Sequence, residues 1–230
     1  MHITGVGTAH PEARYTKAEC LEAFEQSDWF ARLDSRAHLI ARTVLQRDNG
    51  IDSRRLAVDM LADVFTLDPD TLSRRFRQHA PALAAQAGAR ALTAAGLSPT
   101  QIDAVVVSTC TGYICPGLSG HVIERLGLRA NAQAYDLVGQ GCAAALPNMQ
   151  LGHALLATGR SDHVLSICVE VSSARQPRAR MDRVAITRWM RARSRRDRRA
   201  AGSMGARWSS ASAVTTRGSV TALPAKRRDS

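Results

Sequence analysis

The stretch YDLVGQGCAAALPNMQLGHALLATG, from Tyr135 to Gly159, places one cysteine between a predicted strand and a predicted helix. The apolar run Ala132 to Val138 predicts the strand. The Ala- and Leu-rich run Ala143 to Ala157, soon followed by a glycine, predicts the helix. Between them, Gly139 to Gly141 predicts a tight turn, because glycine adopts backbone angles that other residues resist. Cys142 follows this turn directly.

The position of Cys142 indicates a reactive thiol. The first N–H groups of a helix have no backbone partner, and together with the helix dipole they favour negative charge. A thiol placed there ionises more readily and becomes a better nucleophile. The alternative is a small cysteine that only packs, since free cysteine is among the most buried residue types. This stretch alone leaves both interpretations open.

Length and composition limit the class of protein. The chain has 230 residues, enough for one ordinary domain or one and a half small ones. It contains no apolar run of about 18 residues, so no membrane span is predicted. No basic segment precedes an apolar one at the N-terminus, so no secretory signal is predicted. Five scattered cysteines fit a reducing compartment and a cytoplasmic location, and no CxxC or paired-His spacing predicts a metal site.

The basic charge is confined to the C-terminal part of the chain. The formal net charge is +11, but residues 175–230 hold 16 Lys and Arg against three Asp, a net charge of +13. Residues 1–174 therefore carry a net charge of −2. The C-terminal part contains no Glu and few aliphatic residues, a composition that cannot bury a core. We therefore predict a folded region at 1–174 and an Arg-rich tail at 175–230 that is disordered or translated in a shifted reading frame.

Short apolar segments alternate with helical patterns along residues 1–174. This alternation predicts an α/β fold with a layered, partly parallel sheet. The predicted strands are residues 2–8, 104–109, 132–138 and 164–171. The predicted helices are residues 16–25, 36–47, 80–95, 118–126 and 143–157, with a further helix opening at Asp68-Pro69. Pro81 is expected in the first turn of the helix at 80–95, where its missing N–H is tolerated.

Taken together, the cysteine and the loop before it resemble the type III polyketide synthases, the chalcone and stilbene synthase family. Val107 to Gly117, VSTCTGYICPG, is similar to the family's strand and cavity-lining loop. Gly141-Cys142 is similar to its nucleophile turn, and Ile167 to Ser172, ICVEVS, is similar to the strand after the nucleophile helix. The resemblance covers about residues 1–174 and is strongest from Ala104 to Ser172. It implies a thiolase-like layered fold, of which this chain holds the first half of the αβαβα architecture, incomplete.

The resemblance also implies an acyltransferase chemistry. In the family, the residue matching Cys142 takes a starter acyl group from coenzyme A and holds the chain while malonyl-CoA is decarboxylated and condensed. Thr109, Thr111 and Ser172 match positions that shape the cavity. Cys115 matches a residue that reaches into the partner subunit's cavity in the homodimer. For these four residues the alternative is a loop or strand residue that only forms hydrogen bonds within its own backbone segment. The resemblance further implies that CoA thioesters are the substrates and that no cofactor is permanently bound.

One departure from the family's pattern concerns the rest of the catalytic machinery. Family members use a His and an Asn from the second half of a longer chain to stabilise the thioester oxyanion and the enolate. These residues should follow the predicted strand at 164–171, where the Arg-rich tail stands instead. None of the seven histidines matches the catalytic one: His121 and His153 fall on predicted helices, where a surface or packing role is expected, and His163 falls in a predicted turn. The resemblance therefore predicts a truncated chain with little or no condensing activity.

Three alternatives remain open at the level of sequence. A chain-initiating ketoacyl synthase shares the fold and the nucleophile, although the TCTGYICPG loop favours the polyketide branch. A second alternative is a non-catalytic fragment whose tail is translated out of frame. A third makes the basic tail a nucleic-acid-binding arm, which would give salt-sensitive binding. The abrupt change after Ala174, inside a fold, argues against nucleic acid as a partner.

Overall fold

A computed structural model describes residues 2–48, 50–174 and 216–222. Its centre is one mixed sheet of five strands in the order β1-β7-β6-β4-β5. The strands β4, β5 and β6 are parallel, as the alternating pattern predicted, whereas β7 is antiparallel to both of its neighbours. The strand bounds are β1 Ile3–Ala9, β4 Ala104–Thr109, β5 Gln133–Val138, β6 His163–Cys168 and β7 Thr216–Ala222.

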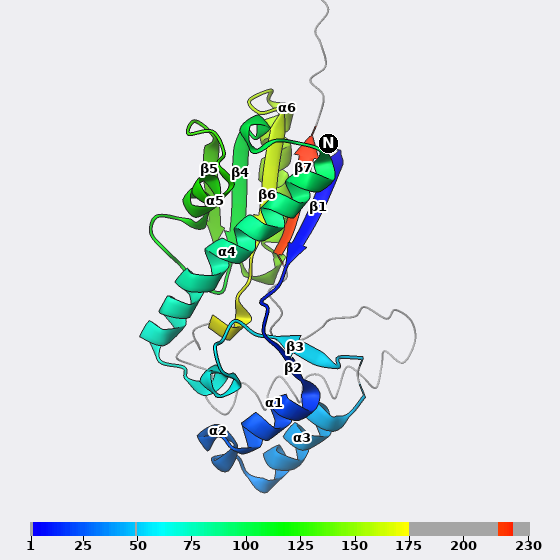
Figure 1. Cartoon of the computed structure of the whole chain (residues 1–230), viewed down its shortest axis with the longest axis vertical. Helices are drawn as coiled ribbons and strands as arrows, with labels where there is room; N and C mark the ends of the chain where they lie inside the picture. Colours follow the sequence, from blue (N-terminus) through cyan, green and yellow to red (C-terminus); the bar gives the residue numbers. More distant parts are fainter. Residues whose placement is uncertain (1, 49, 175–215, 223–230) are drawn as a thin grey trace, which may run out of the picture.

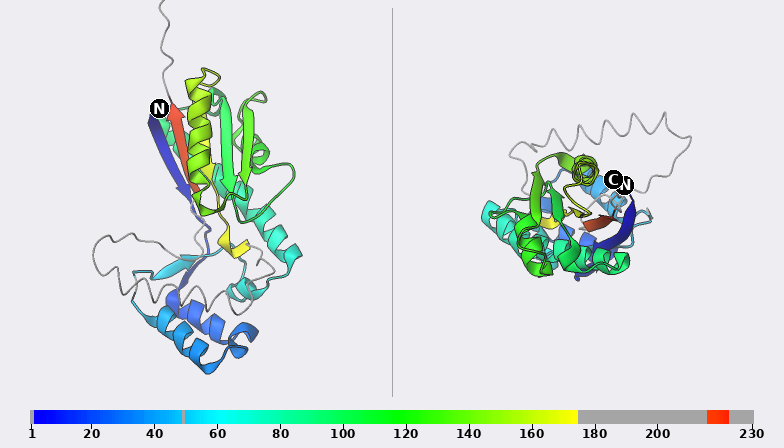
Figure 2. Two further views of the ribbon diagram at one scale, coloured as in Figure 1. Left: turned by 180° about the vertical axis from the view of Figure 1, so that it is seen from behind. Right: turned by 90° about the horizontal axis from the view of Figure 1, so that it is seen from above.

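Helices cover both faces of this sheet. On one face lie α4 (Pro69–Ala95) and α5 (Leu118–Leu126), and on the other lies α6 (Ala145–Ala157) (Figures 1 and 2). Successive side chains of β4 alternate between the two cores that result, and every residue of the strand is buried. A strand buried on both faces reads as a continuous apolar run. This explains why the sequence AVVVST predicted the strand without an alternating pattern.

Small residues bring α4 close to the first strand. Gly5 and Gly7 of β1 face α4, and a Cβ atom built on them would lie 2.3 Å from the Ala91 carbonyl and 2.2 Å from the Ala87 carbonyl. Only glycine permits such an approach of helix to strand. The glycines of the sequence ITGVGTA therefore set the distance between α4 and this side of the sheet.

The helix α4 differs from the prediction of two separate helices. It runs unbroken for 27 residues, with Asp68 as its N-cap and Pro81 in its interior. Proline inside a helix removes one backbone hydrogen bond and favours a break. Here both halves bury the same face, including Phe76 before the proline and Leu83 after it. The gain from burying that face outweighs the lost hydrogen bond.

The N-terminal elements form a small unit beyond the C-terminal ends of the parallel strands (Figure 1). Thr16 and Glu19 form a capping box at the start of α1. Phe24 packs against Phe30 and Phe65, with ring centroids 5.3 and 5.8 Å apart, and gives the unit its own aromatic core. The elements are β2 Arg14–Thr16, α1 Lys17–Glu25, α2 Asp28–Ala31, α3 Ser35–Gln46 and β3 Ser53–Arg55.

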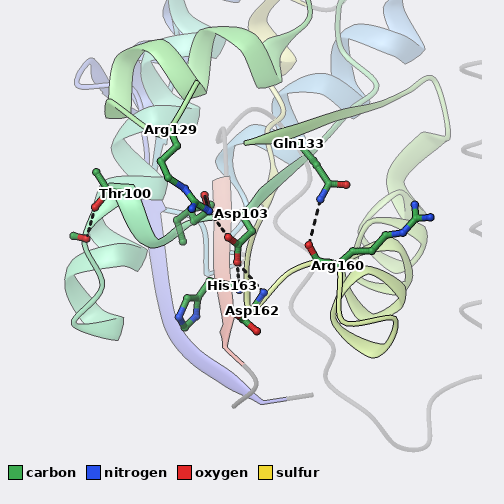
Figure 3. Close-up of polar contacts among 9 residues, drawn as sticks. Thr100, Asp103, Arg129, Gln133, Arg160, Asp162 and His163 are labelled. Carbon is green, nitrogen blue, oxygen red and sulfur yellow. Dashed lines mark hydrogen bonds and ion pairs between the residues drawn. The ribbon is translucent and has the colours of Figure 1, made fainter. Parts of the chain in front are cut away.

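One carboxylate holds the N-terminal ends of the parallel strands together. Asp103, just before β4, accepts hydrogen bonds from the backbone N–H groups of Asp162 (2.8 Å) and His163 (2.9 Å), and pairs with Arg129 (Figure 3). We call these four residues the Asp103 cluster. Burial acts to raise the pKa of Asp103, but the two N–H groups and the guanidinium together lower it below its ordinary value.

Part of the Arg-rich tail belongs to the sheet, which differs from the disorder predicted for it. Thr216–Ala222 form β7 and pair with β1 on one side and β6 on the other. β-branched residues such as Thr216, Val220 and Thr221 favour a strand. Without this strand, β1 and β6 would each keep an unpaired edge. The prediction for the rest of the tail, residues 175–215 and 223–230, concerns residues that the structure does not describe.

Two features are absent from residues 2–48, 50–174 and 216–222, the part of the chain that the structure describes. No helix among these residues is long and apolar enough to cross a membrane. The same residues contain no group of three His, Cys, Asp or Glu side chains arranged to hold a metal ion.

Candidate active site

The turn that carries Cys142 has the backbone that its sequence predicted. Gly139 has a φ of 78° and Gly141 a φ of 75°, values that favour glycine over other residues. Gly141–Ala143 then make a single 3-10 turn, and α6 begins two residues later. The N–H of Gly139 donates to the Thr109 carbonyl at the end of β4 (3.1 Å), which ties the turn to the neighbouring strand. Cys142 is exposed at the tip of this arrangement.

Cys142 lies in the wall of a cavity at the C-terminal ends of β4 and β5. The cavity has a volume of about 530 Å³. Four segments line it: the first turns of α4, the loop after β4, the glycine turn after β5 and the end of the 3-10 turn Ser172–Ala174. Among its lining residues are Leu72, Phe76, Cys110, Thr111, Tyr113 and Val138. A nucleophile on the wall of a space this size can meet a bound acyl group.

The two threonines of the loop after β4 occupy different layers. Thr111 lines the cavity, and its Oγ1 accepts a hydrogen bond from the N–H of Val171 (2.9 Å). Thr109 lies behind it, 2% exposed, and its Oγ1 accepts from the N–H of Thr111 (3.4 Å). Thr109 therefore supports the residue that faces the cavity, whereas Thr111 touches the space itself.

Two other predicted site residues do not join this cavity wall. Cys115 is exposed on the loop before α5, outside the lining. Ser172 is also exposed, at the start of the 3-10 turn Ser172–Ala174, and Ala174 lines the cavity instead. The turn is held by Ser173, whose hydroxyl accepts a hydrogen bond from the N–H of Ala57 (3.1 Å).

The contribution of α4 to the cavity was not predicted from the sequence. Leu72, Ser73 and Phe76 come from its first turns. A Cβ atom on Gly112 would lie 2.4 Å from the Phe76 ring, so this glycine lets the loop rest against the ring. The four-residue spacing of Leu72, Phe76 and Ala80 marks a buried helix face. That spacing does not predict which loop packs against this face of α4.

Glu170 links the cavity loop to the segment after β6 through a hydrogen bond. Its Oε1 accepts a hydrogen bond from the N–H of Cys110 (2.9 Å), which anchors the cavity loop to the segment after β6. Its Oε2 is buried and has no hydrogen-bond partner within the part of the chain that the structure describes.

The described histidines lie away from the cavity wall, and none of them is among its lining residues. His121 and His153 lie on α5 and α6, as predicted. His163 was predicted in a turn, but it is the first residue of β6, at the opposite end of the parallel strands.

Comparisons with known proteins add independent information. A family model described as FAE1/type III polyketide synthase-like protein matches residues 8–179. An alpha-pyrone synthesis polyketide synthase-like protein of Mycobacterium tuberculosis is 32% identical over 129 residues, which are 54% of this chain and 33% of that protein. A beta-ketoacyl-(acyl-carrier-protein) synthase III of Streptomyces coelicolor is 33% identical over 172 residues, which are 74% of this chain and 42% of that protein.

A solved structure resembles the chain in the same way. The crystal structure of PKS-I from the brown alga Ectocarpus siliculosus superimposes with a TM-score of 0.66 at 26% sequence identity. The match covers 75% of this chain and 48% of that one. The chain thus spans between about a third and a half of the length of these three proteins.

Proposed function

Because the chain belongs to the type III polyketide synthase-like family and has its thiolase-like α/β fold in part, we propose that it performs the acyl-loading step of that family. In this step the Cys142 thiolate attacks the carbonyl carbon of an acyl-CoA thioester. The bond from that carbon to the CoA sulfur breaks, CoA leaves as a thiolate that takes up a proton, and the acyl group stays on Cys142. The observation that supports the proposal is Cys142 itself, exposed in a cavity wall on a glycine turn before a helix.

The steps after loading would extend the acyl group that Cys142 carries. We propose that malonyl-CoA is the extender unit and that the functional unit is a homodimer. Thr111 lines the cavity beside the nucleophile, and the exposed Cys115 is free to contact a second subunit. We expect loading without sustained condensation from this chain, since no described residue that lines the cavity is a histidine able to stabilise an enolate.

A second candidate is a chain-initiating ketoacyl synthase. It is favoured by the 33% identity to the Streptomyces coelicolor ketoacyl synthase over 74% of this chain. The two candidates differ in the malonyl donor, which is malonyl-CoA in one case and malonyl-acyl-carrier protein in the other. Measuring which of the two binds the loaded chain separates them.

The loading step is tested by the mass of the intact protein after incubation with acyl-CoA. We expect a gain of one acyl group, released by hydroxylamine as a thioester should be. Cys142→Ala should abolish the gain, and Cys20→Ala, which changes a cysteine on α1 outside the cavity lining, should leave it unchanged. Acylation that persists in Cys142→Ala would place the nucleophile elsewhere and refute the proposal.

A further inference from the structure

A buried polar network lies between α6 and the sheet. Asn148, the fourth residue of α6, is 0% exposed, and its Nδ2 donates to the carbonyls of Val106 (3.2 Å) and Ile167 (2.9 Å). The same amide donates to Ser108 Oγ (3.1 Å), and its Oδ1 accepts from Ser166 Oγ (2.6 Å). We call Asn148, Ser108 and Ser166 the Asn148 network. It joins one helix to two neighbouring strands.

The network divides the interface under α6 into two halves. Beneath the later turns of the helix, Leu155 and Leu156 pack on Ala104, Val106 and Val164 in an apolar cluster. Beneath the first turns, nearest to Cys142, the strands present serines instead, and Asn148 meets them. A well-packed apolar interior would be at least as stable as buried polar groups there. Stability alone therefore does not explain why this half of the interface is polar.

Fixing the position of the helix is such a role. An apolar face of Ala and Leu tolerates small shifts along a sheet, because dispersion contacts are not directional. The Asn148 amide makes its hydrogen bonds at one axial position and one rotation of α6, since both strands must be within reach together. The start of α6 has no side-chain cap that could fix it instead.

We propose that Asn148 is a positioning residue for Cys142, holding the first turn of α6, and with it the nucleophile turn, in place against the cavity. A short backbone path links the two residues: the N–H of Asn148 donates to the Ala144 carbonyl, and the N–H of Ala144 donates to the Gly141 carbonyl (both 3.1 Å). Gly141 immediately precedes Cys142. The inference rests on the proposed acyl-loading function, which defines what Cys142 is positioned for.

The test compares two ways of weakening the contact between α6 and the sheet. Asn148→Leu removes the directional bonds, and the triple variant Asn148→Leu, Ser108→Ala, Ser166→Ala replaces all three side chains of the network by apolar groups, so that no polar side chain of the network is left unsatisfied. Leu155→Ala is the matched control, because it removes apolar packing from the same helix two turns further from Cys142. Each full-length variant is loaded with acyl-CoA at a temperature where circular dichroism shows it folded.

We expect both network variants to lower the maximum rate of Cys142 acylation about tenfold, with the half-saturating acyl-CoA concentration unchanged. Leu155→Ala should lower the melting temperature but leave the acylation rate per folded molecule within about twofold of the unaltered chain. A folded triple variant that loads at the normal rate would overturn the proposal. Equal slowing by Leu155→Ala would also overturn it, since any loosening of α6 would then suffice.

A separate measurement distinguishes failure of this inference from failure of the proposed function. Iodoacetamide alkylation of Cys142, relative to Cys20 in the same molecule, needs no acyl-CoA. If the unaltered chain is not acylated at all, the proposed function fails, and the alkylation ratio still decides the inference. We expect that ratio to change in the network variants and to stay constant in Leu155→Ala; a constant ratio in all of them would refute positioning.

Discussion

The two ends of the parallel strands differ in how their polar groups are used. At the N-terminal ends, the Asp103 cluster closes the sheet with one carboxylate that takes two backbone N–H groups and a guanidinium. At the C-terminal ends, glycine turns leave Cys142 exposed beside a cavity, and Glu170 keeps one buried oxygen without a described partner. Ligands of open α/β sheets bind beyond the carboxyl ends of strands. The difference separates an end whose polar groups hold the strands together from the end at which we propose the acyl-loading chemistry.

The largest loss of stability should come from removing β7, which runs along the full length of the sheet between β1 and β6. A chain that stops at Ala174 lacks β7, so β1 loses its neighbour in the sheet, and β6 keeps β4 but has an open edge on its other side. We expect this chain to aggregate and to show no cooperative thermal transition, because open strand edges and uncovered apolar faces associate. The control is a chain that stops at Ala222, which keeps β7. A monodisperse, cooperatively melting chain ending at Ala174 would show that β7 is dispensable.

Next in size is the loss of the Asp103 carboxylate. Asp103→Ala leaves the N–H groups of Asp162 and His163 without their acceptor, and we expect a loss of about 2–3 kcal/mol in unfolding free energy. Arg129→Ala, which removes the half-exposed ion pair and a long hydrogen bond to the Ile102 carbonyl (3.5 Å), should cost less than about 1 kcal/mol. Urea unfolding measures both. If the comparison of the two ends is right, neither variant changes the alkylation rate of Cys142 in the folded state.

A smaller loss of stability, with a larger effect on chemistry, is expected from the other end. Gly141→Ala places a side chain at a φ of 75°, which costs about 1–2 kcal/mol. The same change should slow acylation of Cys142, because the turn must shift to relieve the strain. Gly120→Ala on α5, where a Cβ atom meets nothing within 4 Å, is the control: it should not lower the stability and should leave the acylation rate unchanged. Normal loading by Gly141→Ala would mean that the turn does not orient the thiol.

The smallest effect concerns pH. The pKa of Asp103 is lowered in the folded state, so its carboxylate stabilises the fold above the unfolded pKa of about 3.9. This stabilisation is lost as the pH falls through the lowered, folded pKa. Between about pH 7 and about pH 3, the unaltered chain should therefore lose more unfolding free energy than Asp103→Asn. Parallel losses in the two proteins would assign the acid sensitivity to other carboxylates.

The sequence by itself determined the local features of the site. The strand, glycine turn, cysteine and helix between Ala132 and Ala157 follow from apolar runs and from φ values open mainly to glycine. The capping box of Thr16 and Glu19 and the buried strand β4 were equally readable. Each of these depends on residues close together in the chain, so the physical cause lies within the stretch that was read.

Only the tertiary structure decided what these features meet. It carried α4 through Pro81, because a buried face spans both halves of that helix, and it brought Phe76 to the cavity beneath Gly112. It also inserted β7 between β1 and β6 and set Asn148 against carbonyls of two strands. These outcomes depend on contacts between residues far apart in the chain. Their free energy comes from packing and hydrogen bonds that no local pattern of residues contains.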